Sequence, residues 1–226
     1  METHFQKQLE ELKENLLKMA TLVEGAIDNA VQSLVKTDSG LAQKAFEAED
    51  RINTMDIAIN TECLNLLALR QPMAADLRFI TSALKIITDL ERMGDQAVNI
   101  AERAISLNRE PQLKPYIDIP RMAEIAQSML KDVLHAFVNR DSKLARSVCE
   151  MDDLVDGLND QVVRELLTYM TSDPKTIKSA MHLMIVSRCL ERIADHATNI
   201  AEDVIFIVDA LVIKHHADTM ENDERG

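Results

Sequence analysis

Two thirteen-residue stretches decide the fold: Leu-Glu-Arg-Met-Gly-Asp-Gln-Ala-Val-Asn-Ile-Ala-Glu at residues 90–102, and Leu-Glu-Arg-Ile-Ala-Asp-His-Ala-Thr-Asn-Ile-Ala-Glu at residues 190–202. Nine of the thirteen positions are identical. A shared apolar helix pattern would repeat the Leu, Ile and Ala positions, but it would not keep Glu, Arg, Asp and Asn in register. The match therefore indicates an internal duplication of the chain.

Weaker matches extend the duplication toward the N-terminal side of each stretch. Asp-Ser-x-Leu-Ala at residues 38–42 recurs at 141–145, and the acidic pair at residues 49–50 recurs at 152–153. The repeated unit is therefore much longer than one helix, and each half of the chain is one copy of it.

Apolar residues recur at steps of three and four along most of the chain, which predicts six amphipathic helices. They are expected at residues 4–36, at 41–69, at 73–107, at 121–138, from the break at 139–142 to 170, and from the corner at 171–174 to 216. Asp38 or Ser39 is suited to cap the second helix, Pro72 marks a corner, and Pro174 occupies the first position of the last helix. Methionines at helical spacing, Met181 among them, are expected to fill the core, with an adaptable partner-binding surface as the alternative.

The duplication and the helix pattern together predict an all-α protein made of two tandem repeats of an antiparallel three-helix bundle. The bundles are expected at residues 1–107 and 121–216, with a linker at 108–120 and a polar tail at 217–226. Helices of about 30 residues are about 45 Å long. Two such bundles placed in series would make an elongated molecule.

Charge and composition exclude several classes of protein. The chain has 38 acidic and 25 basic residues and a net charge of −13, which disfavours binding to nucleic acid or to an anionic membrane surface. No stretch reaches the roughly 18 apolar residues of a membrane span, and the N-terminal residues do not resemble a signal peptide. The scattered cysteines Cys63, Cys149 and Cys189 fit a reducing compartment. We therefore expect a cytoplasmic protein without membrane insertion.

Each thirteen-residue motif places three carboxylates and one amide on a single helix face. Their spacing of four, four and three residues keeps them within an arc of roughly 80°. These residues are Glu91, Asp95, Asn99 and Glu102 in the first half, and Glu191, Asp195, Asn199 and Glu202 in the second. Like charges at this spacing repel one another mildly, so a repeated row suggests a compensating partner.

Three interpretations of this acidic row are open. It is a site for a hard cation such as Mg, Mn, Ca or ferric iron, a polar face or interhelical network neutralised by Arg and Asn, or a ridge that binds a protein. The second helix of each repeat offers further carboxylates at Glu49, Asp50 and Asp56 and at Asp152, Asp153 and Asp156. No Glu-x-x-His pair is present, so the di-iron carboxylate pattern is not met. Catalysis is not expected, because no nucleophile, phosphate loop or His–Asp pairing accompanies the row.

The duplicated Glu-x-x-x-Asp-x-x-x-Asn pattern, at residues 91–99 and 191–199 of a chain with two times three helices, resembles the PhoU family. The segments at residues 4–12 and 70–78 fit the same family. The resemblance covers nearly the whole chain. It implies a six-helix, two-bundle protein that forms homodimers, has no enzymatic activity, and binds metal clusters at the repeated motif.

Carried over to this sequence, the family motif gives Glu91, Asp95, Asn99, Glu191, Asp195 and Asn199 as metal ligands, with Asp50, Glu102, Asp153 and Glu202 as additional candidates. The ions expected from these ligands are Mg, Mn or Fe. The two halves are not equivalent everywhere, since Asp89 aligns with Cys189 and Asp76 with Thr176. Equivalence is therefore expected at the motif rather than around it.

The resemblance also implies a cellular role. Proteins of this family are negative regulators of the phosphate-starvation response that link the phosphate ABC transporter, through its ATPase PstB, to the sensor histidine kinase PhoR. The sequence therefore predicts a regulatory adaptor. The alternatives are a carboxylate metal-binding or metal-storage helical protein and a plain helical scaffold.

Overall fold

The computed structural model describes residues 4–210, and this part of the chain is helical almost throughout. The elements are α1 (His4–Val35), α2 (Ser39–Arg70), α3 (Ala75–Leu107), α4 (Asp118–Asn139), α5 (Ser142–Ser172), a short 3-10 helix η1 (Pro174–Thr176) and α6 (Ile177–Asp209). No strand occurs among the described residues, and the prediction of an all-α chain with six long helices is confirmed. The predicted tail at 217–226 and the predicted helix end at 216 lie outside the described residues.

Aspartates begin the helices that follow the tight turns. The side chain of Asp38 accepts a hydrogen bond from the backbone N–H of Gly40 at 2.8 Å, and Asp141 accepts from the N–H groups of Lys143 and Leu144. Asp173 accepts from the N–H of Lys175 at the corner before α6. Each bond satisfies a backbone donor that has no partner inside its helix, which is why the chain turns at these places.

The segment between the repeats is shorter than predicted and is held in place. α4 begins at Asp118, three residues before the predicted start, because Pro120 lies in its first turn, where a missing N–H costs nothing. Lys114 is only 6% exposed and forms ion pairs with Glu165 of α5 and with Asp118. The linker is therefore anchored to the second repeat.

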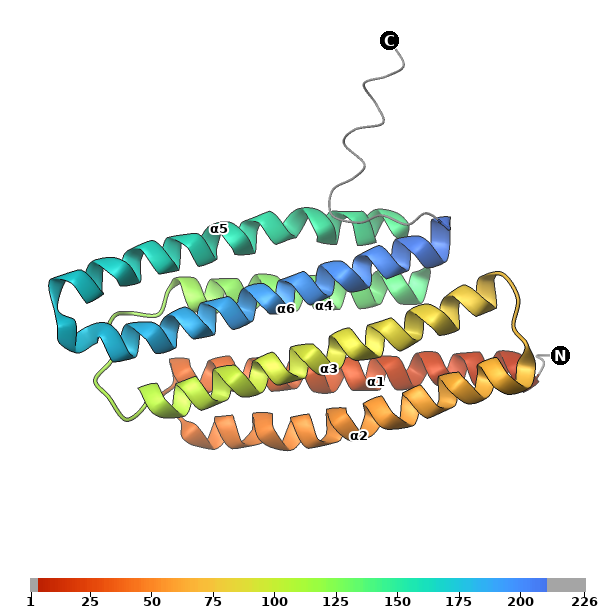
Figure 1. The fold of residues 1–226 in the computed structure, drawn as a ribbon, viewed down its shortest axis with the longest axis horizontal. Coiled ribbons are helices and arrows are strands. Elements are labelled where there is room, and N and C mark those ends of the chain that lie inside the picture. Colours follow the sequence, from red (N-terminus) through yellow and green to blue (C-terminus); the bar gives the residue numbers. More distant parts are fainter. Residues whose placement is uncertain (1–3, 211–226) are drawn as a thin grey trace, which may run out of the picture.

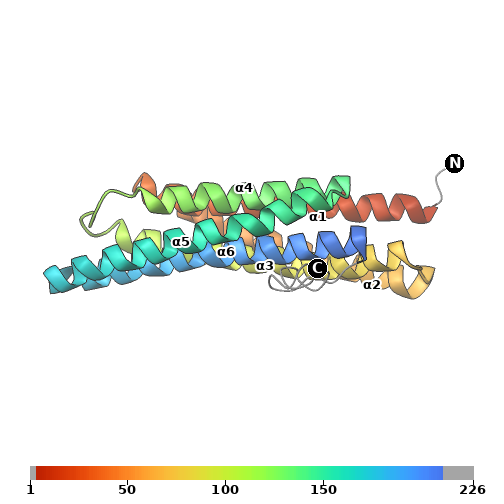
Figure 2. The same ribbon diagram turned by 90° about the horizontal axis from the view of Figure 1, so that it is seen from above.

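The helices form two layers (Figures 1 and 2). α2, α3, α6 and α5 lie side by side in that order, and α1 and α4 pack behind them. Within each repeat all three helices contact one another, and the main contact between the repeats runs along α3 and α6. We call this contact the inter-repeat seam.

The expectation that the two bundles follow one another in series is wrong, because they pack side by side. The physical reason is the width of the apolar face on the third helices. α3 and α6 each bury 16 residues, whereas α2 buries 6. A helix that buries 16 of its 33 residues has too wide a buried face to be covered by the other two helices of its own bundle, so each third helix also packs against its counterpart in the other repeat.

Candidate functional site

The first repeat brings four carboxylates together between α2 and α3. Burial raises the pKa of Glu91, and the charges of Asp95, Asp56 and Glu49 raise it further. The amide of Asn53 donates a 2.8 Å hydrogen bond to Glu49 and so stabilises one member of the group. We call Glu49, Asp56, Glu91 and Asp95 the first acidic cluster.

The second repeat forms the corresponding second acidic cluster, which consists of Asp152, Asp156, Glu191 and Asp195 between α5 and α6. Burial, followed by the charges of Asp195, Asp156, Asp153 and Glu191, raises the pKa of the Asp152 carboxyl to about 6. Its Oδ1 atom is buried and has no hydrogen-bond partner within residues 4–210. Glu191 pairs with Arg188 of its own helix, whereas no donor reaches this oxygen of Asp152, so the charge of Asp152 is the poorly compensated one in the cluster.

The motif amides do not join the two clusters in the same way. Asn99 donates to the backbone carbonyl of Asp95 at 3.0 Å, one turn back on its own helix. Asn199 instead donates across the inter-repeat seam to Oδ1 of Asp89 at 3.3 Å. The equivalent sequence positions thus have different partners.

The four additional candidate ligands lie at the edges of the acidic clusters or outside them. Glu102 pairs with its neighbour Arg103 at 3.3 Å, and Asp50 and Asp153 are exposed. Glu202 is half-buried and lies near Cys149, whose pKa is raised by burial and then by the charge of Glu202. The residues that do adjoin the motif carboxylates are Glu49, Asp56, Asp152 and Asp156. The sequence identified these four only as carboxylates on the neighbouring helix.

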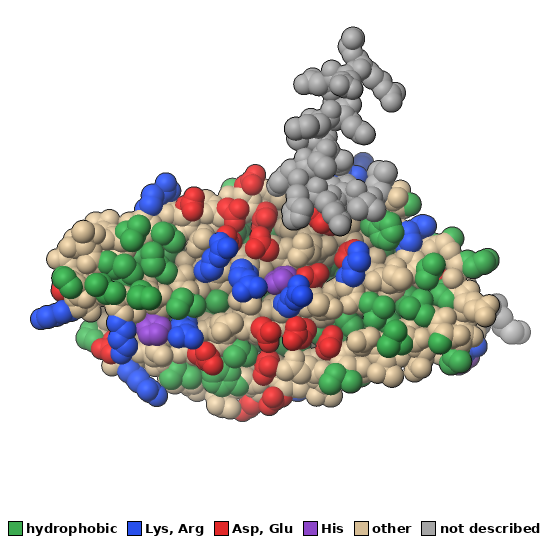
Figure 3. All heavy atoms as spheres, viewed as in Figure 1, with side chains coloured by type: hydrophobic (Ala, Val, Ile, Leu, Met, Phe, Trp, Pro, Cys, Tyr) green, Lys and Arg blue, Asp and Glu red, His purple; other side chains and the backbone are tan. Residues whose placement is uncertain are grey.

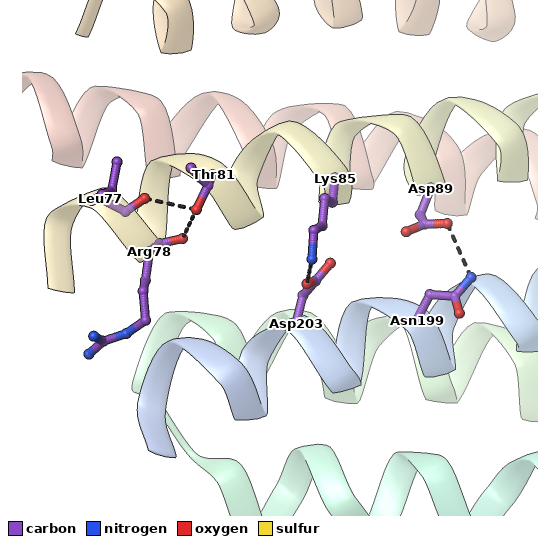
Figure 4. Close-up of polar contacts among 7 residues, drawn as sticks. All are labelled: Leu77, Arg78, Thr81, Lys85, Asp89, Asn199 and Asp203. Carbon is purple, nitrogen blue, oxygen red and sulfur yellow. Dashed lines mark hydrogen bonds and ion pairs between the residues drawn. The ribbon is translucent and has the colours of Figure 1, made fainter. Parts of the chain in front are cut away.

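A set of polar contacts joins the repeats at one end of the seam (Figure 4). Figure 4 shows Lys85, which pairs with Asp203 at 2.7 Å, and Asp89 beside Asn199. Nδ1 of His196 also lies 2.9 Å from Oδ1 of Asp89. Asp89, His196 and Asp203 are all more than nine-tenths buried. Because a carboxylate only accepts, the geometry assigns the proton of His196 to Nδ1.

This contact corrects an expectation from the sequence, which found no His–Asp pairing near the row. The paired positions are 107 residues apart, so helical spacing could not reveal them. One signal was present: Asp89 aligns with Cys189, and His196 aligns with Gln96, so both members of the pair depart from the duplication. Beside this pair lies an open pocket of about 400 Å³, lined by Leu84, Lys85, Thr88, Asp89, Arg92, Asn199, Glu202 and Asp203.

The acidic clusters contain the ligand types that a metal ion requires, but their side chains do not converge on one point. Carboxylate and amide oxygens are the ligands that Mg, Mn, Ca and ferric iron prefer. Among residues 4–210, however, no three His, Cys, Asp or Glu side chains converge closely enough to hold one ion in common.

The fold and these clusters define a class of protein. It is a helical protein of two three-helix repeats joined side by side by their third helices, with an acidic cluster between the second and third helix of each repeat. Over the described residues, none of the helices combines the length and apolar content that crossing a bilayer requires.

Comparison with known proteins identifies a family that matches both repeats of the chain. A family model described as the PhoU domain matches residues 16–104 and again 119–204, one match for each repeat. A curated relative from Aquifex aeolicus, the "Phosphate-specific transport system accessory protein PhoU homolog", is 49% identical over 209 residues, covering 92% of this chain and 95% of the relative. The corresponding protein of Pseudomonas putida is 42% identical, covering 93% of this chain and 83% of its own length.

Solved structures agree with the sequence comparisons. The crystal structure of PhoU from Pseudomonas aeruginosa aligns with a TM-score of 0.89 at 42% identity, covering 92% of this chain and all of that one. The phosphate transport system regulatory protein PhoU from Streptococcus pneumoniae aligns with a TM-score of 0.88 at 29% identity, covering 94% of this chain and all of that one. The chain belongs to the PhoU family, and the resemblance inferred from the duplicated motif is confirmed.

Proposed function

We propose that this chain is an accessory regulator of phosphate transport that acts by contact rather than by catalysis. The observation that carries the proposal is the match of both repeats to one family whose curated relatives are named for that role, at up to 49% identity over almost the full chain. In its finer form, the chain is a cytoplasmic adaptor between the ATPase of the phosphate transporter (PstB) and its sensor kinase (PhoR). It represses the starvation response when phosphate is plentiful.

A phosphate-starvation reporter in the source bacterium tests this role. With the chain deleted and phosphate abundant, the reporter is expected to switch on, and a plasmid copy of the chain is expected to switch it off again. Glu150→Gln, an exposed carboxylate on α5 outside the clusters, serves as the matched surface control and is expected to restore repression fully. A silent reporter in the deletion strain would contradict the proposal.

We further propose that the acidic clusters bind a hard cation, Mg, Mn or Fe, and that the chain is a homodimer. The support for the metal is the crowding of carboxylates around Glu91 and Asp152, where burial and like charges raise both pKa values. The ligands from the family motif are Glu91, Asp95, Asn99, Glu191, Asp195 and Asn199. The neighbours Glu49, Asp56, Asp152 and Asp156 complete the donor sets better than Asp50, Glu102, Asp153 or Glu202.

Metal analysis of protein purified without chelators tests the cation site. The parent is expected to carry Mg, Mn or Fe in a fixed ratio, and Glu91→Ala/Asp95→Ala is expected to lose the share held by the first cluster. Equal metal content in the two proteins would show that these residues are not ligands. Light scattering during gel filtration of the same samples gives the oligomeric state.

A further inference from the structure

Each repeat exposes apolar side chains on its second and third helices, which belong to the four-helix layer. Leu64 is 56% exposed on α2 and lies in the same repeat as Leu77, which is 42% exposed on α3. Leu167 on α5 and Ile177 on α6 are 49% and 42% exposed. The first apolar patch is Leu64, Leu77 and the half-buried Leu84, and the second apolar patch is Leu167, Ile177 and the half-buried Met184.

Met181 of α6 adds to the exposed surface of the second patch. The expectation that it fills the core is wrong, because it is 54% exposed. On the face of the four-helix layer that Figure 3 shows, hydrophobic side chains gather toward both ends, and acidic and basic side chains occupy the middle. Exposed apolar groups that gather at two separate places are characteristic of a contact surface.

The two patches are equivalent by the internal duplication. Leu64 and Leu167 occupy the same position of the second helix, and Leu77 and Ile177 occupy the same position of the third helix. α3 and α6 run antiparallel at the seam, since Lys85 meets Asp203 while Asp89 meets Asn199. Equivalent helices that pack antiparallel are related by an approximate twofold axis. The patches therefore lie on opposite sides of a twofold axis that passes through the seam.

The charge between the patches indicates what binds there. Both acidic clusters lie between the two ends of this layer, and each contains four carboxylates. Arg92, Arg188 and Arg192 are exposed on the same third helices, and Arg188 already pairs with Glu191, but the eight carboxylates outnumber these cations. A second copy of the chain would bring these carboxylates against an equally acidic face, and its net charge of −13 would oppose the approach. A partner with Lys and Arg opposite the clusters would instead be attracted and oriented.

We propose that this face docks a basic protein that is itself a twofold-symmetric dimer, with each of its subunits contacting one apolar patch. The proposal rests on the adaptor role described above and deepens it by naming the symmetry and the charge of the partner. One chain would then bind two partner subunits along a shared axis. The contact would depend on both patches and would weaken as salt screens the charges between them.

Photocrosslinking in the source bacterium identifies the occupant. Benzoylphenylalanine replaces Leu64 in one strain and Leu167 in another. Thr21 and Glu124 serve as matched controls, because they occupy equivalent positions on α1 and α4, in the groove on the other side of the molecule. Both patch positions are expected to capture the same protein, identified by mass spectrometry, and the controls are expected not to capture it.

Purified components complete the test. The captured protein is expected to be a dimer and to bind one chain per two subunits. Leu64→Glu and Leu167→Glu are each expected to weaken binding roughly tenfold, and the double variant roughly a hundredfold. Circular dichroism verifies that the exposed substitutions leave the fold intact. Two different captured proteins, a second copy of this chain, no capture from either patch, or a single variant as weak as the double would each overturn the proposal.

The two proposals fail separately. If loss of the chain switches on the phosphate reporter while the two patches capture different proteins, the regulatory role stands and the symmetric docking face is wrong. If the reporter stays silent while both patches capture one dimeric protein, the docking face stands and the phosphate role is wrong.

Discussion

The two acidic clusters have the same number of carboxylates but arrange them differently. In the first repeat, the second helix contributes Glu49, Asn53 and Asp56, and Asn53 donates to Glu49 at 2.8 Å. The duplication aligns Asn53 with Asp156 and Asp56 with Asn159. The amide and the carboxylate have therefore exchanged places in the second repeat.

This exchange leaves the second cluster without an internal donor from α5. Asn159 is turned inward, where its side-chain carbonyl accepts a 2.8 Å hydrogen bond from Ser187. Asp156 takes the place of the donating amide and adds a charge that helps raise the pKa of Asp152 to about 6. The duplicated motifs thus produce similar acidic faces. The residues around each motif determine how well hydrogen bonds and neighbouring charges stabilise the carboxylates.

The seam shows the same kind of asymmetry, and breaking it is expected to give the largest effect. Asp89→Ala removes the acceptor of His196 and Asn199. It leaves the buried Nδ1–H of His196 unsatisfied, whereas the exposed amide of Asn199 can bond to water. The free energy of unfolding should fall by about 2–3 kcal/mol. Denaturant unfolding measures this, with Cys189→Ala at the equivalent position as the control.

Cys189→Ala removes only a sulfur from an apolar site and should cost about 1 kcal/mol or less. Equal losses for the two variants would show that the polar contacts contribute nothing beyond packing. A loss for Asp89→Ala that disappears in an Asn199→Ala/His196→Ala background would support the unsatisfied-donor explanation.

The next largest effect concerns the amide that distinguishes the clusters. Asn53→Asp gives the first cluster the pattern of the second, so it loses the bond to Glu49 and gains a repelling charge. We expect a loss of about 1–2 kcal/mol at neutral pH. The reciprocal Asp156→Asn should be mildly stabilising, since its carboxylate is mostly exposed and its charge is screened. If both variants destabilise by the same amount, the difference between the clusters does not come from this position.

Several of these features were predictable from sequence, and the seam was not. The duplication, the helix breaks at Asp38 and Asp141, and the acidic faces follow from spacing along one chain. Spacing gives the direction of a side chain on its own helix, but it does not say which helix lies opposite. The pairing of Asp89 with His196 and the side-by-side bundles therefore required the structure.

The pH dependence of stability separates the clusters further. The pKa of Asp152 is raised in the folded chain from the ordinary 3.8 to about 6, so the folded state holds this proton more tightly than the unfolded state. The stability due to this group is present below pH 4 and is lost as the pH rises toward 6. Asp152→Asn should therefore stabilise the chain by about 1 kcal/mol at pH 7.5, a value reduced for the partial exposure of the carboxyl, and give no gain at low pH.

Thermal unfolding at several pH values measures this difference. Glu49→Gln, at the equivalent position of the first cluster, is the matched control. A gain for Asp152→Asn that is the same at pH 3.5 and pH 7.5 would mean that packing, rather than charge, is responsible.

The smallest effect is expected at the exposed carboxylates beside the clusters, where the comparison between sequence and structure is sharpest. Asp50 and Asp153 were candidate ligands by sequence position, yet both are exposed, whereas Glu49 and Asp152 adjoin the motif carboxylates. Asp50→Asn and Asp153→Asn should leave metal content and the unfolding midpoint unchanged, because solvent already screens these charges. Elemental analysis of these two variants, compared with Glu49→Gln and Asp152→Asn, measures which carboxylates hold the metal. If Asp50→Asn or Asp153→Asn removes metal as completely as Glu91→Ala/Asp95→Ala does, the ligands are those that sequence position indicates, and the side chains must rearrange when the ion binds.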